Sequence, residues 1–283
     1  MTVKVAICFF GITRGVSTTY RNIEANIYSS IAALNFEHKV FAHFFEQTRV
    51  ENNRSGEKGT IDPNDAYLLS PDDIYFEPPE LFLADSTYKN VIKFGDFWED
   101  ENKSIKNLYH QLYSMASVTD KCLKWQPDIV LFLRPDLHYH DDFRTIIEQA
   151  SKRIHKNSLA LPNWQHCGGY NDRFAVVTGE EAIVAYGKRF NKMLKFCEET
   201  NSPIHSERLV KYSTSAFDVS FIPLRASRVR SDGSEVEELF LHYKTMLFSR
   251  WLENVSSVSQ HYRRKIVWLY QKLRFGDPYK GLD

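Results

Sequence analysis

Residues 128–139 read DIVLFLRPDLHY, the strongest signal of a central strand in the chain. Its apolar residues are consecutive and begin with β-branched Ile and Val. A continuous apolar run bounded by polar residues is typical of a strand that is buried on both faces of a parallel sheet. Arg134, Asp136 and His138, which can carry chemistry, follow directly after it. We therefore predict a central strand over Asp128–Leu133 with candidate ligand-binding residues at its carboxyl end.

Strand and helix patterns alternate along the rest of the chain. Apolar residues at three-to-four spacing predict a long amphipathic helix over Ser104–Trp125, directly before the central strand. The N-terminal run Val3–Phe10 predicts another buried strand. Such alternation predicts an α/β fold with a mainly parallel sheet, right-handed crossovers and flanking helices. Further strands are expected at 39–45, 74–76, 159–161, 175–177 and 219–222, and further helices at 20–34, 180–197, 206–215 and 235–273.

The segment 46–66 is polar and contains Gly, Pro and Asn. It shows no apolar periodicity, so we do not expect it to form a core element. We predict a surface loop there, with a lid over a binding site as the functional alternative.

The composition is that of an ordinary globular protein and narrows the function classes. The chain has 283 residues, 43% of them hydrophobic, and 36 Lys and Arg balance 36 Asp and Glu. A zero net charge argues against a nucleic-acid partner, since such partners are bound through an excess of cations. The four cysteines stand singly, which indicates neither a zinc site nor a disulfide framework. The apolar run Val5–Phe10 is too short for a signal peptide or a membrane span, so we expect a cytoplasmic protein.

The first candidate site is the segment GITRG, residues 11–15, which follows the N-terminal strand. Its two glycines permit close backbone approach to a ligand, and Thr13 and Arg14 offer hydrogen-bond donors at the start of a helix. The segment resembles a phosphate-binding loop only loosely, because it matches neither of the glycine-rich consensus patterns. An ordinary strand-to-helix turn is the structural alternative.

The second candidate site lies at the end of the central strand. Because successive side chains of an extended segment point to opposite faces, Arg134, Asp136 and His138 can converge on one side. A carboxylate and an imidazole two residues apart could share a divalent cation, and the guanidinium could hold a phosphate. The alternative is a structural ion pair between Arg134 and Asp136 beside an exposed His138.

Five segments of the chain together resemble a known family. They read VAICFFGITRG at 5–15, KVFAHFF at 39–45, NLYHQLYSMASVTDKCLKWQPDIVLFLRPDLHY at 107–139, GGYNDRFAVVTGEEA at 168–182 and HSERLVKYSTS at 205–215. The series resembles the small GT-A-fold glycosyltransferases of bacterial surface-polysaccharide loci and large algal viruses, over roughly residues 3–232. The resemblance implies a GT-A-like domain over 1–232 with a helical extension, 233–283, packed on it. It also implies an enzyme that transfers a sugar from a nucleotide-sugar, a UDP-sugar, to a hydroxyl of a glycan acceptor.

The resemblance also implies donor-binding roles. The end of the central strand is similar in position to the D-x-D motif that holds the nucleotide-sugar diphosphate through a divalent cation, Mn²⁺ or Mg²⁺. Here His138 replaces the second acid, so Asp136 and His138 would be the metal ligands, although imidazole suits Mn²⁺ less well than carboxylate does. The residues implied to lie at the nucleotide are Gly11, Thr13, Arg14 and His43.

Two arginines after the last strand, Arg228 and Arg230, could close over the diphosphate, with solvated loop arginines as the alternative. Two carboxylates are candidates for catalysis. Glu207 lies where the resemblance places the catalytic carboxylate of many inverting members, so it is the first candidate for the general base. Asp172, after the glycine turn at 168–169, is the second candidate, and it could instead hold sugar hydroxyls. The structural alternatives are a helix-dipole interaction for Glu207 and capping of local backbone by Asp172.

The C-terminal end combines apolar and basic side chains. Residues 261–275 read HYRRKIVWLYQKLRF. Packing of the apolar face over the main domain is one interpretation. A peripheral membrane contact, which would serve a lipid-linked or membrane-displayed acceptor, is the other.

Two other functions stay open from the sequence. The strand-end acids would also suit a nucleotide-sugar or phosphate-ester hydrolase, or a nucleotidyltransferase. A non-catalytic glycan-binding protein on a transferase fold is the third possibility, because the second acid of the D-x-D motif is missing. Turnover of the nucleotide without an acceptor, or release of pyrophosphate, would mark the former class, and indifference to UDP would mark the latter.

Overall fold

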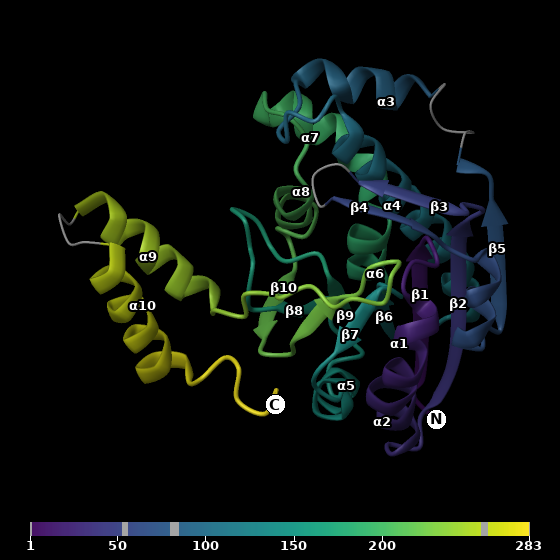
Figure 1. The fold of residues 1–283 in the computed structure, drawn as a ribbon. Coiled ribbons are helices and arrows are strands. Elements are labelled where there is room, and N and C mark those ends of the chain that lie inside the picture. Colours follow the sequence, from purple (N-terminus) through teal and green to yellow (C-terminus); the bar gives the residue numbers. More distant parts are fainter. Residues whose placement is uncertain (1, 53–55, 80–84, 256–259, 283) are drawn as a thin grey trace.

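The computed structural model describes residues 2–52, 56–79, 85–255 and 260–282. Its centre is a seven-stranded sheet in the order β10-β8-β9-β6-β1-β2-β5 (Figure 1). Adjacent strands run parallel except at β9, which is antiparallel to both β6 and β8. The predicted mainly parallel α/β fold is therefore confirmed. The strands are β1 (Lys4–Gly11), β2 (Glu37–Phe45), β5 (Asp73–Glu77), β6 (Ile129–Leu133), β8 (Ser158–Pro162), β9 (Phe174–Thr178) and β10 (Asp218–Ile222).

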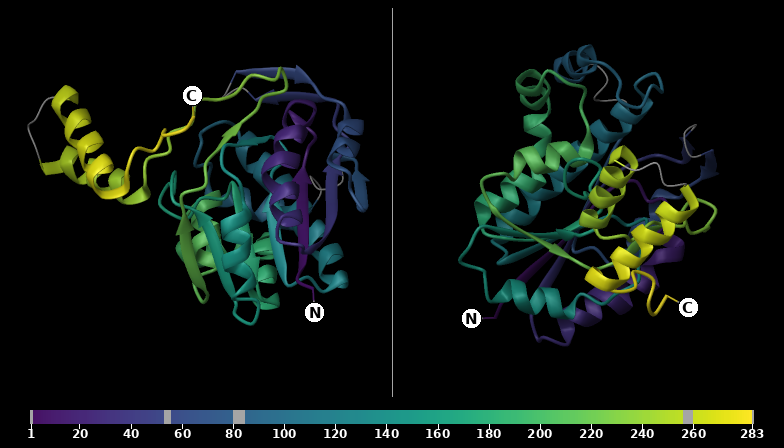
Figure 2. Two further views of the ribbon diagram at one scale, coloured as in Figure 1. Left: turned by 90° about the horizontal axis from the view of Figure 1, so that it is seen from below. Right: turned by 90° about the vertical axis from the view of Figure 1, so that its left-hand side faces the viewer.

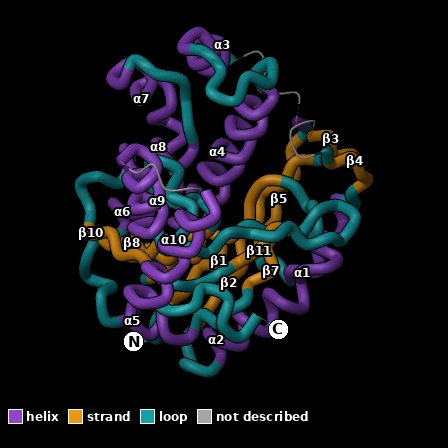
Figure 3. Tube along the Cα trace, turned by 60° about the vertical axis from the view of Figure 1, so that its left-hand side comes forward, coloured by secondary structure: helices purple, strands orange, loops and turns teal. Residues whose placement is uncertain are grey.

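Helices cover both faces of the sheet (Figure 3). Because side chains alternate along β1, Val5 and Ile7 pack toward one helical layer while Ala6 and Cys8 pack toward the other. This two-sided burial explains why the strands read as continuous apolar runs. The first layer contains α1 (Val16–Ile23), the π-helical turn η1 (Glu24–Tyr28), α2 (Ser29–Ala32) and α5 (Arg144–Ser151). The second contains α4 (Lys103–Cys122), followed by η5 (Leu123–Trp125), α6 (Glu180–Gly187) and α8 (Ser206–Ser213).

The helix predicted over 180–197 is two helices separated by a 3-10 turn. After α6 come η6 (Arg189–Lys192) and α7 (Met193–Thr200). The end of α6 packs closely on α4 at Gly187, where a Cβ would lie 2.2 Å from Thr119 Oγ1. Apolar residues recur across the break, so the sequence pattern did not reveal it. Near α7 the chain forms α3 (Ser86–Val91) and η4 (Ile92–Phe94), which pack with α4, α7 and α8 in a further apolar cluster.

A β-hairpin stands where the sequence predicted a loop over 46–66. It consists of β3 (Arg49–Asn52) and β4 (Glu57–Thr60), and the 3-10 helix η2 (Pro63–Leu69) follows it. Most of its side chains are polar, so there was no apolar alternation to mark the strands. The hairpin packs closely on a distant segment, since a Cβ on Gly59 would lie 2.1 Å from Ser231 Oγ.

A second small sheet joins the end of β6 to the segment that follows β10. In it β7 (Leu137–Tyr139) runs antiparallel to β11 (Ala226–Arg228), with His138 opposite Ser227. The pairing continues into the backbone, where Val229 N donates to the Asp136 carbonyl at 2.8 Å. Residues 226–229 therefore lie directly beside the polar end of the central strand.

The C-terminal residues form a helical hairpin of α9 (Tyr243–Val255) and α10 (Gln260–Phe275), which projects from the sheet domain (Figure 2). The helix predicted from 235 thus begins at Tyr243. Contacts at the base of the hairpin and in the segment after it join them to the domain. The Tyr243 ring stacks on His166 with centroids 4.5 Å apart. Arg225, paired with Asp141 at 2.7 Å, donates to the Lys280 carbonyl at 2.8 Å.

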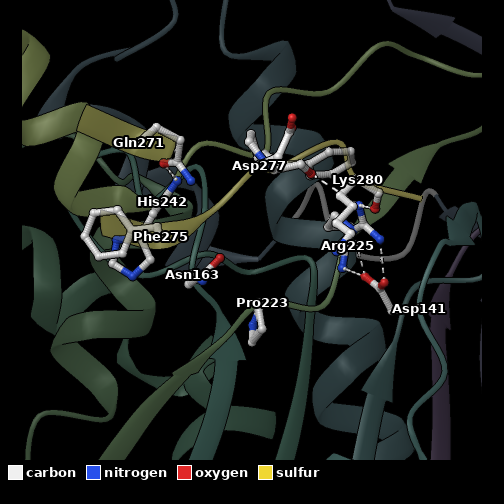
Figure 4. Close-up of a pocket in the computed structure, with 11 residues that line it drawn as sticks. Asp141, Asn163, Pro223, Arg225, His242, Gln271, Phe275, Asp277 and Lys280 are labelled. Carbon is white, nitrogen blue, oxygen red and sulfur yellow. Dashed lines mark hydrogen bonds and ion pairs between the residues drawn. The ribbon is translucent and has the colours of Figure 1, made fainter. Parts of the chain in front are cut away.

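A cavity of about 240 Å³ lies at this junction between the domain and the C-terminal segment (Figure 4). Arg225, which lines the cavity, is held by Asp141 and by backbone carbonyls. The cavity therefore belongs to the junction that anchors the hairpin. Within the part of the chain that the structure describes, none of the helices has the length and apolar character needed to cross a membrane.

Candidate active site

The strand order reverses its direction between β1 and β6. From β1 the chain continues to β2 on one side, whereas β6 lies on the other side, so the loops that leave β1 and β6 diverge. In open α/β sheets, ligands bind at such a switch point, beyond the carboxyl ends of the strands. Arg14 follows β1, and Arg134 and Asp136 follow β6. The sequence candidates from both segments therefore meet where the topology predicts a ligand.

The carboxylate of Asp136 lies between two guanidinium groups. Arg134 donates from Nε to Oδ1 at 2.9 Å and from Nη2 to Oδ2 at 2.8 Å. Arg14 donates from Nε to Oδ2 at 3.1 Å, and its Nη2 also bonds to Oδ2. Burial would raise the pKa of Asp136, but the two arginines outweigh it and hold that pKa well below its usual range. Asp136 therefore stays ionised and fixes both guanidinium groups.

The other residues predicted in the first loop shape the backbone. Gly15, the N-cap of α1, has a φ of 72°, and a Cβ there would lie 3.1 Å from the Val229 carbonyl. Thr13 is buried and donates to the Asp62 carbonyl at 2.8 Å. Gly11 has a φ of 105° and donates its N–H to Ser114 Oγ at 2.8 Å. Among the loop residues predicted to bind the donor, Arg14 is thus the one whose side chain reaches the Asp136 carboxylate.

His43 lies behind Gly11 on the face of the sheet that α4 covers. Its Nδ1 is 2.9 Å from Ser114 Oγ, and its Nε2 is 3.5 Å from Glu77 Oε1. The side chain is buried, and this burial lowers the pKa of His43 despite the opposing effect of Glu77. The structure does not bring His43 to the Asp136 carboxylate.

His138 also faces a different partner. Its Nδ1 is 2.9 Å from Glu235 Oε2, and the neighbouring His140 ring lies 5.1 Å away, with its Nε2 bonded to Ser227 Oγ at 2.7 Å. Meanwhile both oxygens of Asp136 accept hydrogen bonds from arginine. Across the described ranges, no group of three or more His, Cys, Asp or Glu side chains could hold a metal ion. Asp136 and His138, as placed here, do not fit the predicted Mn²⁺ or Mg²⁺ site.

Two buried glutamates that the sequence did not indicate complete the charge cluster. Glu57, on the β3–β4 hairpin, is 3.0 Å from Arg14 Nη1 and accepts the N–H of Ser231 at 3.0 Å. Glu238 accepts from Arg228 Nε at 2.6 Å and lies 3.6 Å from Arg173 Nη2. Both acids stand in polar runs of sequence, which gave no signal of burial.

Arg173 is the second kind of residue that the sequence missed. It immediately precedes β9, and because β9 is antiparallel, this end lies at the carboxyl edge of the parallel strands. Burial lowers the pKa of Arg173, and the like charges of Arg228 and Arg134 lower it further, although Glu238 acts to raise it. Arg173 and Arg228 share the single carboxylate of Glu238, so a bound anion would stabilise these guanidinium groups. Arg14, Arg134, Arg173 and Arg228 together are called the arginine cluster. Arg230 instead lies in a turn, where its backbone N–H donates to the Ser234 carbonyl at 2.9 Å.

The two predicted carboxylates, Asp172 and Glu207, come together at the start of α8. Ser206 donates its hydroxyl to Asp172, and Tyr170 N donates to the Glu207 carbonyl at 2.9 Å. The approach requires Gly169, because a Cβ there would lie 1.9 Å from that carbonyl oxygen. The glycine turn therefore holds both carboxylates beside the arginine cluster.

The environments of these carboxylates push their pKa values apart. Burial raises the pKa of Glu207, and the negative charge of Asp172 raises it further, to about 8. Burial would also raise the pKa of Asp172, but Arg173 and the Ser206 hydroxyl outweigh it and lower that pKa. A pair of this kind offers one carboxylate that stays ionised and one that exchanges a proton near neutral pH.

Comparison with known proteins gives likenesses in fold. No protein-family model matches the sequence, and no curated protein matches it. The chain is similar to mouse xyloside xylosyltransferase 1, at 11% identity and a TM-score of 0.41, over 78% of this chain and 85% of that one. It is similar to the galactosyltransferase LgtC with donor and acceptor sugar analogs, at 11% identity and a TM-score of 0.41, over 77% and 72%. For the glycosyltransferase GlyE of Streptococcus pneumoniae the values are 12% and 0.41, over 100% and 62%. Likenesses of this size assign no activity.

We predict that inorganic pyrophosphate binds the arginine cluster in the presence of EDTA. At a concentration of about 100 times Kd it should raise the melting temperature by about 5 °C. Arg173→Gln should lose most of this shift, because it removes an incompletely compensated cation. Arg153→Gln is the matched control, since Arg153 is half exposed and pairs with Asp218 on the surface. If pyrophosphate raises the melting temperatures of Arg173→Gln and Arg153→Gln equally, it binds at a site other than the arginine cluster.

Proposed function

We propose that this chain is an inverting glycosyltransferase that moves a sugar from a UDP-sugar to a hydroxyl of a glycan acceptor. The observation that carries the proposal is the position of the arginine cluster at the β1–β6 switch point. Beside it lie two carboxylates, Asp172 with a lowered pKa and Glu207 with a raised pKa. The cluster suits a diphosphate, and the carboxylates suit the activation of a hydroxyl. The choice of uridine comes from the sequence resemblance.

On the donor side, Arg14, Arg134 and Arg173 are the residues proposed to face the diphosphate. Each charged hydrogen bond to phosphate contributes about 1.5–3 kcal/mol, and guanidinium groups suit phosphate geometry. Asp136 would not contact the donor itself but would hold two of these arginines in place. The positive charge that the reaction needs would thus come from side chains.

During transfer, the bond between the anomeric carbon and the diphosphate oxygen breaks while the acceptor oxygen attacks the same carbon. Negative charge grows on the departing diphosphate, where the fixed guanidinium groups stabilise it without reorganisation. The acceptor hydroxyl loses its proton to Glu207, which interacts with Asp172 and Arg173. An acceptor oxygen that attacks opposite the departing diphosphate inverts the configuration. Asp172, kept ionised by Arg173, is suited to accept hydrogen bonds from sugar hydroxyls.

The C-terminal hairpin is proposed as a peripheral membrane contact in this function, with residues 1–232 as the transfer domain. Exposed apolar side chains stand on both helices, with exposed fractions of 57% for Trp251, 58% for Leu269 and 75% for Leu273. Basic residues accompany them on α10, and this combination suits an anionic bilayer surface. The basic residues are Arg263, Arg264, Lys265, Lys272 and Arg274.

The pH dependence of transfer tests the role of Glu207. A base must be ionised, so kcat/KM should rise about tenfold per pH unit and level off above about pH 8. Glu207→Gln should lower kcat by about 10²- to 10⁴-fold and abolish this rise. Asp172→Asn removes the negative charge that raises the pKa of Glu207, so the midpoint should move to lower pH. Full activity of Glu207→Gln at pH 8 would remove Glu207 from the mechanism.

Vesicle binding tests the role of the hairpin. The double variant Leu269→Glu/Leu273→Glu should reduce co-sedimentation with phosphatidylserine-containing vesicles by about tenfold or more, because it replaces exposed apolar contacts with charge. The control is Leu68→Glu, which alters a side chain of 42% exposure on η2. Unchanged binding of the double variant, or an equal loss in the control, would contradict a membrane contact through α10.

A further inference from the structure

The loop 95–102, between η4 and α4, is built to hold a fixed shape. The Asp96 carboxylate accepts the N–H groups of Trp98 at 3.0 Å, Asp100 at 2.9 Å and Asn102 at 2.8 Å. The backbone has positive φ at Gly95 (99°), Glu99 (53°), Glu101 (61°) and Asn102 (64°). Left-handed conformations at non-glycine residues cost free energy and persist where the surroundings determine them.

This loop presents two aromatic rings to the start of α8. Trp98 stacks on His205 with centroids 5.6 Å apart and an angle of 17° between the rings. Phe97 meets the same imidazole edge to face, at 4.4 Å and 82°. The guanidinium carbon of Arg208 lies 5.3 Å from the centre of the Phe97 ring. Figure 1 shows α3, α7 and α8 gathered beside α4 on this side of the domain.

His205 connects the aromatic pair to the proposed base. Its Nδ1 lies 3.2 Å from Glu207 Oε2, and its side chain is buried. Glu207 therefore interacts electrostatically with Asp172 and Arg173 and also contacts His205, against which Phe97 packs. If the diphosphate occupies the arginines, the region of His205 and Phe97 is where the molecule that loses its proton to Glu207 would approach.

Phe97 is exposed, unlike the large aromatic residues of the interior. Its exposed fraction is 44%, whereas Tyr109 and Trp164 are 1% and 0% exposed and belong to the packed interior. An exposed aromatic ring with polar groups converging beside it is typical of a ligand site. The apolar C–H face of a pyranose suits such a ring, and Arg208 can donate to its hydroxyls.

We propose that the ring of Phe97 is the platform on which a pyranose of the acceptor glycan lies, with the attacking hydroxyl directed at Glu207. This inference rests on the proposed glycosyl transfer and adds to it the location of the acceptor. The rigid loop 95–102 would fix the Phe97 ring. The Trp98–His205 stack would keep this ring at a constant position relative to Glu207.

The test uses the intact chain with UDP-glucose, UDP-galactose and UDP-N-acetylglucosamine as donors. Methyl glycosides of glucose, galactose and N-acetylglucosamine serve as acceptors, because they lack an aromatic aglycone that could stack by itself. For the best pair, Phe97→Ala should raise the acceptor KM about tenfold or more, with the donor KM and the Kd for UDP within about twofold. Phe97→Tyr and Phe97→Trp should restore the parent acceptor KM.

Tyr67→Ala is the control, because Tyr67 is an aromatic residue of 57% exposure on η2. An unchanged acceptor KM in Phe97→Ala would overturn the platform while leaving glycosyl transfer standing. A fall in kcat with a displaced pH profile and unchanged acceptor KM would also overturn it, since Phe97 would then act through His205. A parent chain that neither binds UDP nor transfers any of these sugars would overturn the proposed function and the platform together.

Discussion

The Asp136 carboxylate, held between the guanidinium groups of Arg14 and Arg134, is the interaction on which the rest of the site depends. It joins the loop after β1 to the end of β6 across the switch point of the sheet. Removal of one member of such a buried set leaves an uncompensated charge and costs about 3–5 kcal/mol. The requirement to keep this carboxylate paired therefore stabilises the loops and also fixes the donors that would meet a diphosphate.

From this pair, alternating charges extend outward and recruit segments that lie far apart in the chain. Arg14 binds Glu57 of the β3–β4 hairpin, whose other oxygen accepts the N–H of Ser231. Arg173 and Arg228 converge on Glu238. Burial acts to raise the pKa of Asp172, but the charge of Arg173 and the Ser206 hydroxyl lower it; burial raises the pKa of Glu207, and the negative charge of Asp172 raises it further. The difference between the two carboxylates thus follows from burial together with the charge network.

The sequence predicted the elements that are buried on two faces, because continuous apolar runs such as 129–133 require that burial. It also named Arg14, Arg134 and Asp136 as candidates at two separate strand ends, and the sheet topology brings these ends together. It did not predict the β3–β4 hairpin or Glu57, since their burial depends on one distant arginine and one backbone N–H and leaves no periodic pattern. His138 was expected beside Asp136 from strand alternation, but pairing of β7 with β11 directs it to Glu235.

Calorimetric titration of the intact chain with UDP and with uridine, both in EDTA, measures whether the arginines at the switch point bind the diphosphate. If the arginines at the switch point hold the diphosphate, UDP makes two or more charged hydrogen bonds that uridine cannot make. UDP should therefore bind about 100-fold more tightly than uridine. Added Mn²⁺ should leave the Kd for UDP nearly unchanged, because Asp136 is already occupied by arginine. Equal affinity for UDP and uridine, or UDP binding that appears only with Mn²⁺, would show that the arginines alone do not hold the diphosphate.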